Sequence, residues 1–408
     1  MGDIATIAVI FGGRSVEHDV SVLTGIQFLE ALDQSRYRGL AVYVDPDGQW
    51  WCGDALRRRS SYPLSPQTKE SLDAVTLPVG VAVGSRGPHL LTARKGLLGS
   101  RVEAISFDLM VPAIHGSFGE DGSLQGLLAF AGIPFAGSRA LGAAATMDKH
   151  FTKESLRALG LPVLPHALIA RPETGGLPPR ALLEEMLDKA LKGPRFPLIV
   201  KPRRLGSSVG VALAEDMDAL EAALLAAFRL DNSALIEPVV PDLIEYNIAV
   251  MRVGGAIRTS AIERPLAASA VLDFSNKYLA GAGAKGAKSD GLPSEGMASL
   301  NREIAPDSLS PEQDARIRDA AICAFAHFEL AGTVRIDFLA NGRTGELWLN
   351  EINAIPGSFA WFLWQAASEP IGFTALATLL VEEGFRLAEN ERGARDVAAG
   401  RSQIFRRD

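Results

Sequence analysis

The first 140 residues alternate between short apolar runs and helix-like stretches, and this alternation constrains the fold more than any other feature. Residues 4–11 (IATIAVIF) carry no charge and stop at a Gly-Gly pair, which is typical of a strand buried on both faces. A helix is expected over 21–32, a strand at 40–44, and a strand followed by a turn over 107–116. This order of strands and helices predicts an open parallel α/β domain.

Local signals in the same region predict one hairpin and the start of one helix. The segment DPDGQWW (45–51) indicates a hairpin with Asp-Gly at its tip. Asp121 is expected to cap a helix that runs through Ala131. Residues 55–100 are rich in Arg, Ser, Pro and Gly, so we expect peripheral strands and loops there.

The length of 408 residues is enough for two or three domains of about 150 residues each. A second unit is expected from about residue 146 and a third from about residue 235. The second contains predicted elements at 149–159, 179–192, 196–202 and 216–228, and the third at 248–253, 311–328, 333–340 and 346–353.

Composition excludes several classes of protein. Lysine and arginine total 41 against 48 aspartates and glutamates, a net charge of −7, which makes nucleic acid a poor partner. Hydrophobic residues make up 47%, which excludes disorder of the whole chain. Cys52 and Cys323 are too few for a disulfide framework. The N-terminus lacks a basic stretch, and no uncharged run reaches the ~18 residues of a membrane helix, so a cytoplasmic protein without membrane contact is expected.

The strongest local signal is the segment 332–353, where two alternating strands flank a turn containing Asn-Gly. Residues two apart in a strand share a face, so Arg335 lies with Asp337 and Glu351 lies with Asn353. Carboxylate and amide oxygens of this kind suit Mg²⁺ together with phosphate oxygens. The alternative is a salt-bridged face exposed to solvent.

This grouping depends on the register of the hairpin. If Leu339 pairs with Leu349, all four polar side chains lie on one face. The flanking Trp348 and Ile352 favour burial of that face, and burial favours the metal site over the solvent-exposed alternative.

A second segment, LIVKPRRLGSSVGV, places Lys201 at the end of a strand and follows it with the loop 206–210. Glycines allow backbone N–H groups to approach phosphate oxygens, and the two serines add donors. The loop is not a Walker A loop, because no Gly-Lys-Ser/Thr opens a helix. An ordinary β-hairpin loop is the alternative.

Three further motifs are weaker when taken alone. Met147-Asp148-Lys149 indicates a capped helix, with either an exposed lysine or an anion-binding one. HGSFGEDGSLQG (115–126) follows a strand end, where open α/β sheets bind ligands, although its histidine could be a bonded core residue. GGRSVEHDVS (12–21) could hold an amine or could supply only turn and cap residues, and it lacks the spacing of a dinucleotide fingerprint.

Together, and in this order, five motifs resemble those of the D-alanine–D-alanine ligases of the ATP-grasp superfamily. They are FGGRSVEHDVS, HGSFGEDGSLQGLL with AGIPFAGS, MDKHFTK, FPLIVKP with LGSSVG, and VRIDF with LNEIN and IPG, over roughly residues 4–365. The resemblance implies an α/β fold of three-domain ATP-grasp architecture. An N-terminal open parallel α/β (pre-ATP-grasp) domain would span 1–143, followed by two α+β ATP-grasp subdomains over 144–236 and 237–408.

The resemblance also implies a role for each matching residue. Glu17 matches the glutamate that holds the first substrate's amine, and Glu237 opens the linker that meets adenine. The implied positions are Glu17, Ser207, Tyr278, Arg335 and Gly357 for catalysis, Lys149, Lys201, Ser208, Glu237, Glu245 and Lys277 for ATP, Asp337, Glu351 and Asn353 for the metal, and Asp19, His115 and Ser358 for substrate.

The implied reaction joins a carboxylate to an amine through an acylphosphate, with ATP converted to ADP. It would use two Mg²⁺ ions, or Mn²⁺ in their place, and small amino acids as substrates, in a cytoplasmic homodimer. Peptidoglycan precursor synthesis is the implied setting, and neither nucleic acid nor membrane is an expected partner.

The sequence departs from the family pattern at several positions. Asp19 replaces the usual second glutamate of the first motif, and Ser275-Asn276 precede Lys277 where a glutamate is usual. The stretch between Glu237 and Glu245 is one residue longer than usual, and a Gly/Ala/Ser-rich segment extends the lid over 279–299. The serine that binds the second amino acid's carboxylate is replaced by Phe362.

These departures leave other functions open. An enzyme of the same fold could join a different amino acid or a natural-product acceptor, and Phe362 motivates that alternative. An ATP-binding protein without turnover is disfavoured, because the phosphate lysines and the acidic hairpin are intact. A dinucleotide oxidoreductase is disfavoured by the missing GxGxxG.

Overall fold

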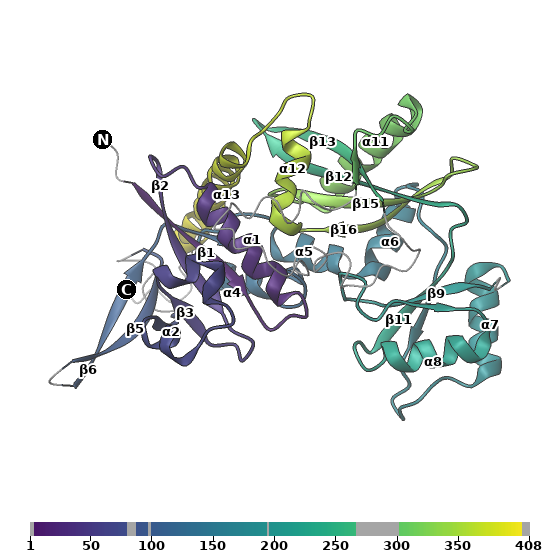
Figure 1. Ribbon diagram of the computed structural model, residues 1–408, viewed down its shortest axis with the longest axis horizontal. Helices are drawn as coiled ribbons and strands as arrows, with labels where there is room; N and C mark the ends of the chain where they lie inside the picture. Colours follow the sequence, from purple (N-terminus) through teal and green to yellow (C-terminus); the bar gives the residue numbers. More distant parts are fainter. Residues whose placement is uncertain (1–3, 80–86, 97–98, 194–195, 267–301, 402–408) are drawn as a thin grey trace.

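The computed structural model describes residues 4–79, 87–96, 99–193, 196–266 and 302–401, and its strands form three sheets (Figure 1). The first sheet contains β1 (Ala5–Gly12), β2 (Tyr37–Val44), β3 (Trp50–Cys52), β4 (Asp73–Thr76), β5 (His89–Gly96), β6 (Gly99–Ser106) and β7 (Leu109–Pro112). The second contains β8 (Ala167–Ala170), β9 (Leu198–Pro202), β10 (Ala212–Ala214) and β11 (Ser233–Pro238). The third contains β12 (Leu243–Val253), β13 (Ala256–Pro265), β14 (Arg302–Ile304), β15 (Val334–Asn341) and β16 (Leu347–Asn353).

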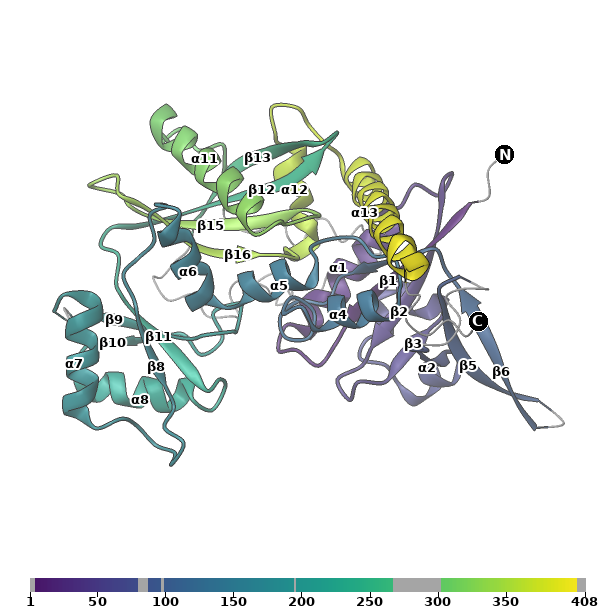
Figure 2. The same cartoon turned by 180° about the vertical axis from the view of Figure 1, so that it is seen from behind.

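The helices surround these sheets and connect them. They are α1 (His18–Ala31), α2 (Pro66–Glu70), α4 (Ser123–Phe130), α5 (Ala140–Met147), α6 (Lys149–Ala158), α7 (Arg180–Leu191), α8 (Met217–Ala227), α11 (Pro311–His327), α12 (Trp361–Gln365) and α13 (Phe373–Arg401), with 3₁₀ turns η1 (Asp54–Arg57), η2 (Arg59–Ser61) and η3 (Gly357–Ala360). In Figure 2, α5 and α6 run from the first sheet toward the second. In the described residues, no helix is both long and apolar enough to cross a membrane.

The first sheet is parallel only at one end, where β1 pairs in parallel with both β2 and the edge strand β7. The expected buried strand at 4–11 is confirmed, but the outer strands β3 to β6 pair antiparallel, so the sheet as a whole is mixed. The short connections from β2 to β3 and from β5 to β6 favour this, because a connection of a few residues can join only antiparallel neighbours, whereas longer segments join β3 to β4 and β4 to β5. In the expected hairpin at 45–51, Asp45 Oδ1 accepts the N–H groups of Asp47 at 3.1 Å and Gln49 at 2.9 Å.

Two helix starts differ from expectation. The first helix begins at His18 rather than near Ser21, and the Ser21 hydroxyl instead donates to the carbonyl of Ala113 at 2.7 Å and accepts from the Gly12 N–H at 2.8 Å. Asp121 does not occupy the cap position of α4, which falls on Gly122 with φ +84°. Asp121 accepts N–H groups on both sides of itself, and these bonds shape the turn before the helix.

The second and third sheets each pack against their own helices. The core of the second sheet joins β8, β9 and β11 to α7 and α8, and the core of the third joins β12, β15 and β16 to α11. The expected helices and strands of both units are present within a few residues of their predicted bounds. In Figure 1 the first and second sheets lie toward opposite ends of the molecule, with the third between them.

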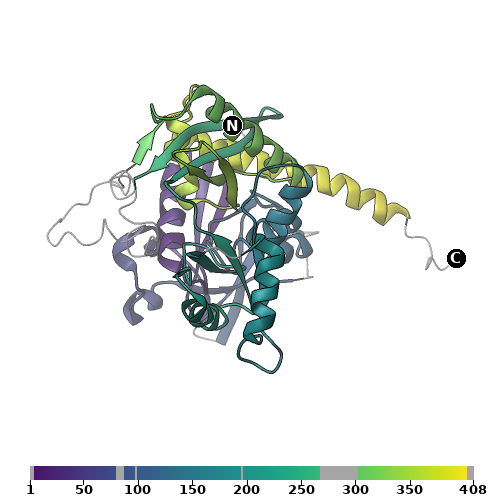
Figure 3. The ribbon, with the colours of Figure 1, turned by 90° about the vertical axis from the view of Figure 1, so that its right-hand side faces the viewer.

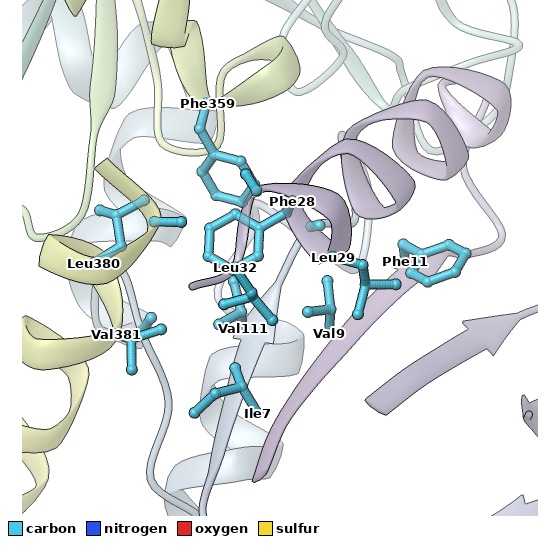
Figure 4. Close-up of a cluster of buried hydrophobic side chains, with 14 of the residues drawn as sticks. Ile7, Val9, Phe11, Phe28, Leu29, Leu32, Val111, Phe359, Leu380 and Val381 are labelled. Carbon is cyan, nitrogen blue, oxygen red and sulfur yellow. The ribbon is translucent and has the colours of Figure 1, made fainter. Parts of the chain in front are cut away.

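The C-terminal segment completes the core of the first sheet. Figure 4 shows Phe359, Leu380 and Val381 packed against side chains of α1, β1 and β7. The rings of Phe28 and Phe359 lie 4.8 Å apart. The turn η3 is therefore fixed between sheets one and three, while the later turns of α13 extend away from the body of the molecule (Figure 3).

Candidate active site

The polar face of the third sheet carries the predicted metal ligands. Arg335 pairs with Asn353 and Asp337 pairs with Glu351 across β15 and β16, so the four side chains share a face as expected. Toward the turn the register shifts by one residue, and Leu339 pairs with Trp348 instead of Leu349. A β-bulge between Asp337 and Phe338 causes the shift, because one extra residue of β16 is accommodated there.

Asp337 is the centre of this face. Arg335 donates to it through Nε and a terminal nitrogen, both at 2.7 Å, and Asn353 Nδ2 donates at 3.0 Å. Asp337 is 9% exposed, and the side chains of Arg335 and Glu351 are 20% and 28% exposed, so the salt bridge on this face is largely shielded from solvent. The two carboxylates and the amide oxygen on this face are metal ligands of the kind that a hard divalent cation such as Mg²⁺ prefers.

A cavity of about 240 Å³ lies between the second and third sheets. Apolar side chains form much of its wall, and the charged lining groups include two close pairs, Lys201 with Glu237 at 2.6 Å and Lys149 with Glu351 at 3.9 Å. The predicted ATP and metal positions that line it are Lys149, Lys201, Ser208, Glu237, Glu245, Asp337 and Glu351. An apolar wall beside a group of cations and carboxylates suits a nucleotide, whose base is flat and whose phosphates are charged.

Lys149 begins α6 after the cap residue Asp148, whose side chain accepts the Phe151 N–H at 3.0 Å. The lysine is not on the surface, because only 11% of its side chain is exposed. Its ammonium donates to the Leu205 carbonyl and lies 3.9 Å from Glu351. Lys149 therefore connects the 205–210 loop to the acidic hairpin.

Glu237 is buried between two lysines, an arrangement that motif analysis did not anticipate. Its carboxylate lies 2.7 Å from Lys153 and 2.6 Å from Lys201, and Lys201 also donates to Asn350 at 3.2 Å. Burial alone would raise the pKa of Glu237, but the two lysines hold it well below the usual range. Lys153 stands four residues after Lys149, one helical turn away, and that spacing was the available sequence signal.

Glu17 lies against the loop 205–210 and forms a second polar cluster with it. It is 7% exposed, and the Ser207 hydroxyl donates to it across 190 residues of sequence. Burial raises the pKa of Glu17, and the Ser207 bond and the charge of Lys149 oppose that rise. A Cβ added to Gly116 would lie 2.3 Å from the Glu17 carboxylate, so any larger residue there would have to displace that carboxylate.

Glu120 connects the residues around Glu17 to the segment that follows β16, the last strand of the third sheet. Its two oxygens accept the N–H groups of Gly116 and Ile355, each at 2.8 Å. Burial and the nearby Glu17 raise the pKa of Glu120 to about 8. Glu120 lies within the quoted HGSFGEDG motif, but its bridging role depends on a contact 235 residues away.

The predicted substrate residues fall into two groups. His115 and Ser358 are buried and share Thr24, whose hydroxyl oxygen lies 2.8 Å from His115 Nε2 and accepts the Ser358 N–H at 3.1 Å. Asp19 is exposed on the first turn of α1, apart from the buried Glu17. Gly357 begins η3, whereas Lys277 and Tyr278 lie outside the described residues. The hydrogen bond between His115 and Thr24 is the kind expected of a core histidine.

We expect His115 to make the folded protein sensitive to mild acid. Burial lowers its pKa to about 4 from a usual value of 6.5, so the unfolded chain binds more protons between those values. Stability is therefore complete above about pH 6.5 and falls as the pH drops, by about 2 kcal/mol near pH 5. Thermal unfolding of wild type and His115→Asn across that range should show a smaller loss in the variant. Parallel curves would contradict the assignment.

Two families match the chain in succession. The family described as D-ala D-ala ligase N-terminus matches residues 6–138, and that described as D-ala D-ala ligase C-terminus matches residues 155–382. The D-alanine–D-alanine ligase A of Chromobacterium violaceum is 33% identical over 408 residues, covering 98% of this chain and 99% of the relative. The D-alanine–D-alanine ligase of Deinococcus radiodurans is 32% identical over 382 residues, covering 92% and 97%.

The fold agrees with these sequence matches. The solved structure of the D-alanine–D-alanine ligase from Coxiella burnetii superimposes with a TM-score of 0.73 at 24% identity, covering 97% of this chain and 99% of that one. The ordered motifs, the charged cavity and the two sequence matches lead to one conclusion. The chain belongs to the D-alanine–D-alanine ligase family.

Proposed function

We propose that the protein is an ADP-forming ligase that joins two D-alanine molecules for peptidoglycan precursor synthesis. The observation that carries this proposal is the position of Lys149. Its ammonium contacts both the loop over Glu17 and the acidic hairpin, so amino-acid and nucleotide sites meet at one point. The names of the relatives supply the substrate.

In the proposed mechanism, the carboxylate of the first amino acid attacks the γ-phosphorus of ATP, and ADP leaves. The amine of the second amino acid then attacks the acyl carbon, loses a proton, and inorganic phosphate leaves. Lys149 and Lys201 would offset the phosphate charge during the first step. Arg335 would stabilise the tetrahedral oxyanion of the second, and Glu17 would hold the first amine.

Asp337, Glu351 and Asn353 would hold the divalent metal, which supplies charge neutralisation at the transferring phosphate. We propose two Mg²⁺ ions, replaceable by Mn²⁺, because the hairpin offers two carboxylates on one face. We also propose domains at 1–143, 144–236 and 237–408, a cytoplasmic location and a homodimer, as the family resemblance implies. Light scattering of the purified protein at micromolar concentration tests the dimer.

The proposed reaction is tested by phosphate release with ATP and Mg²⁺ across a panel of D- and L-amino acids, with the product mass determined. D-alanine alone should yield ADP and a dipeptide of two alanines. If D-alanine yields no ADP and another pair does, the substrate assignment is wrong and the alternative of a different acceptor stands.

The close approach of Gly116 to Glu17 leads to a sharper test. In Gly116→Ala, the new methyl group displaces the Glu17 carboxylate, so kcat/KM for the first amino acid should fall by about 100-fold. The control is Gly160→Ala, because Gly160 has a similar φ of +76° with no neighbour within 4 Å of its added Cβ. Both variants carry the same backbone penalty, so an equal loss of activity would contradict the contact argument.

The second amino acid's carboxylate needs a partner, because Phe362 stands where the family has serine. We propose Arg302. Its guanidinium lies 4.2 Å from the Phe362 ring and donates to Glu263 at 2.9 Å, and Glu263 accepts from Asn247 at 2.9 Å. Asn247 pairs with Asp337 across the strands, so this chain of bonds follows the same face as the metal ligands.

Arg302→Gln should raise the KM for the second amino acid by about tenfold or more, because a charge-assisted hydrogen bond to the carboxylate is lost. The KM for ATP should change little. Arg258→Gln is the control, since Arg258 is a half-exposed arginine of the same sheet that pairs with Glu369. An unchanged KM for the second amino acid in Arg302→Gln would remove Arg302 from the acceptor site.

A further inference from the structure

Two histidines and a glutamate converge beside the nucleotide cavity. His150 and Glu154 stand one turn apart on α6, so their side chains share a face of that helix. His166 lies in the segment just before β8. His150 Nδ1 is 2.9 Å from His166 Nε2, which is 3.5 Å from the Glu154 carboxylate, and one ligand atom from each residue lies within 4.8 Å of the others.

We propose that His150, Glu154 and His166 form a binding site for a divalent transition-metal ion of the Zn²⁺ class, separate from the magnesium site of the acidic hairpin. Two imidazoles and one carboxylate are the ligands that Zn²⁺, Co²⁺ and Ni²⁺ prefer, and a water would complete four-fold coordination. Metal–nitrogen bonds of about 2.0–2.1 Å place tetrahedral ligands about 3.3 Å apart. The observed spacings of 2.9 and 3.5 Å therefore need only small adjustments.

The hydrogen bonds around His166 show what a metal must displace. Arg157 lies 3.3 Å from His166 Nδ1, and because a guanidinium can only donate, Nδ1 accepts and the ring proton is on Nε2. That proton points at His150 Nδ1. A metal on Nε2 moves the ring proton to Nδ1, which then can no longer accept from Arg157. The ring stays neutral throughout.

Arg157 is therefore a competitor of the metal. It also forms an ion pair with Glu154, which would have to open. The Arg157 side chain is 44% exposed, so it can turn into solvent at modest cost. Removing Arg157 should strengthen metal binding, whereas removing a ligand should weaken it. These opposite directions distinguish a metal site from an ordinary hydrogen-bonded cluster.

A bound ion would link α6 to the segment that enters β8. The same helix carries Lys149 into the nucleotide cavity and Lys153 to Glu237, which lines that cavity, and Leu164 of the segment before β8 lines the cavity wall. Metal binding should therefore raise the unfolding temperature of the protein, because it stabilises only the folded arrangement.

Co²⁺ titration of the full chain followed by visible absorption tests this proposal, with excess Mg²⁺ present and no polyhistidine tag. All proteins carry Cys323→Ser, because Cys323 and His327 stand one turn apart on α11 and could bind metal themselves. The parent should bind one equivalent with a tetrahedral Co²⁺ band. His150→Gln and Glu154→Gln should each weaken binding by about tenfold or more, Arg157→Gln should tighten it, and His327→Gln should leave it unchanged.

The proposal fails if the parent shows no Co²⁺ band, if His150→Gln and Glu154→Gln bind as tightly as the parent, or if Arg157→Gln binds more weakly. His150 and Glu154 are not fully buried, so their variants should fold even if a substitution at the buried His166 does not. Circular dichroism of each variant checks this. Ligase activity is not the readout, so failure of the metal site leaves the proposed function untouched.

Discussion

Replacing Lys201 by alanine is expected to lower turnover by about two to three orders of magnitude while the protein stays folded. Lys201 lines the cavity, and its ammonium is proposed to meet the phosphates of ATP there. Glu237 and burial act on it in opposite directions, and Glu237 prevails, raising the pKa of Lys201 above its usual value. The lysine is therefore charged when the nucleotide arrives.

The stability of Lys201→Ala should be close to that of the wild type, because Glu237 keeps its ion pair with Lys153. Steady-state ADP release and thermal unfolding measure the two effects on the same samples. Lys189→Ala, on the exposed face of α7, is the matched control for loss of one positive charge. Turnover equal to the wild type in Lys201→Ala would exclude a role in phosphate binding.

Replacing Arg335 is expected to be about as damaging, by about two to three orders of magnitude in dipeptide formation. The guanidinium is held by two bonds to Asp337 on the face that carries the proposed metal ligands, where the tetrahedral oxyanion of the second step would form. Its loss also leaves the buried Asp337 without its cation, which adds a structural cost.

Arg335→Lys separates these two contributions. Lysine keeps the charge beside Asp337 but cannot form the paired donor geometry, so stability should recover while dipeptide formation stays low. Dipeptide and ADP should be quantified together, since a defect in the second step lowers dipeptide more than ADP. If Arg335→Lys restores dipeptide formation fully, charge alone is sufficient and the oriented donor is not required.

Much of the fold could be predicted from sequence because periodicity reports burial. The uncharged run at 4–11 is a strand paired in parallel on both sides, and the alternating segment at 332–353 is the expected hairpin. The antiparallel pairing of β3 to β6 in the first sheet was harder to predict from the sequence. Residues 55–100 show weak periodicity, and long segments separate β3 from β4 and β4 from β5, so local pattern does not indicate which strands pair.

The candidate site divides in the same way. Lys149, Lys201 and the hairpin carboxylates were predictable because each belongs to a compact motif. The pairing of Lys153 and Lys201 with one glutamate was not, because Lys153 precedes Glu237 by 84 residues and its spacing suggests only an ordinary helix face. The hydrogen bond from Ile355 to Glu120 was not predictable for the same reason, because 235 residues separate the two in the sequence.

The sequence by itself determined the order of the strands and helices, the two lysines proposed to bind phosphate and the polar face of the hairpin, because these depend on residues close together in the chain. Only the tertiary structure decided which charges meet. The sequence leaves open whether Glu237 is ionised, and the structure places two lysines beside its buried carboxylate. The sequence also leaves the register of the hairpin open, and the structure contains a β-bulge that shifts it by one residue. Electrostatic interaction depends on distance in space and on exclusion of water, and neither is written in local sequence.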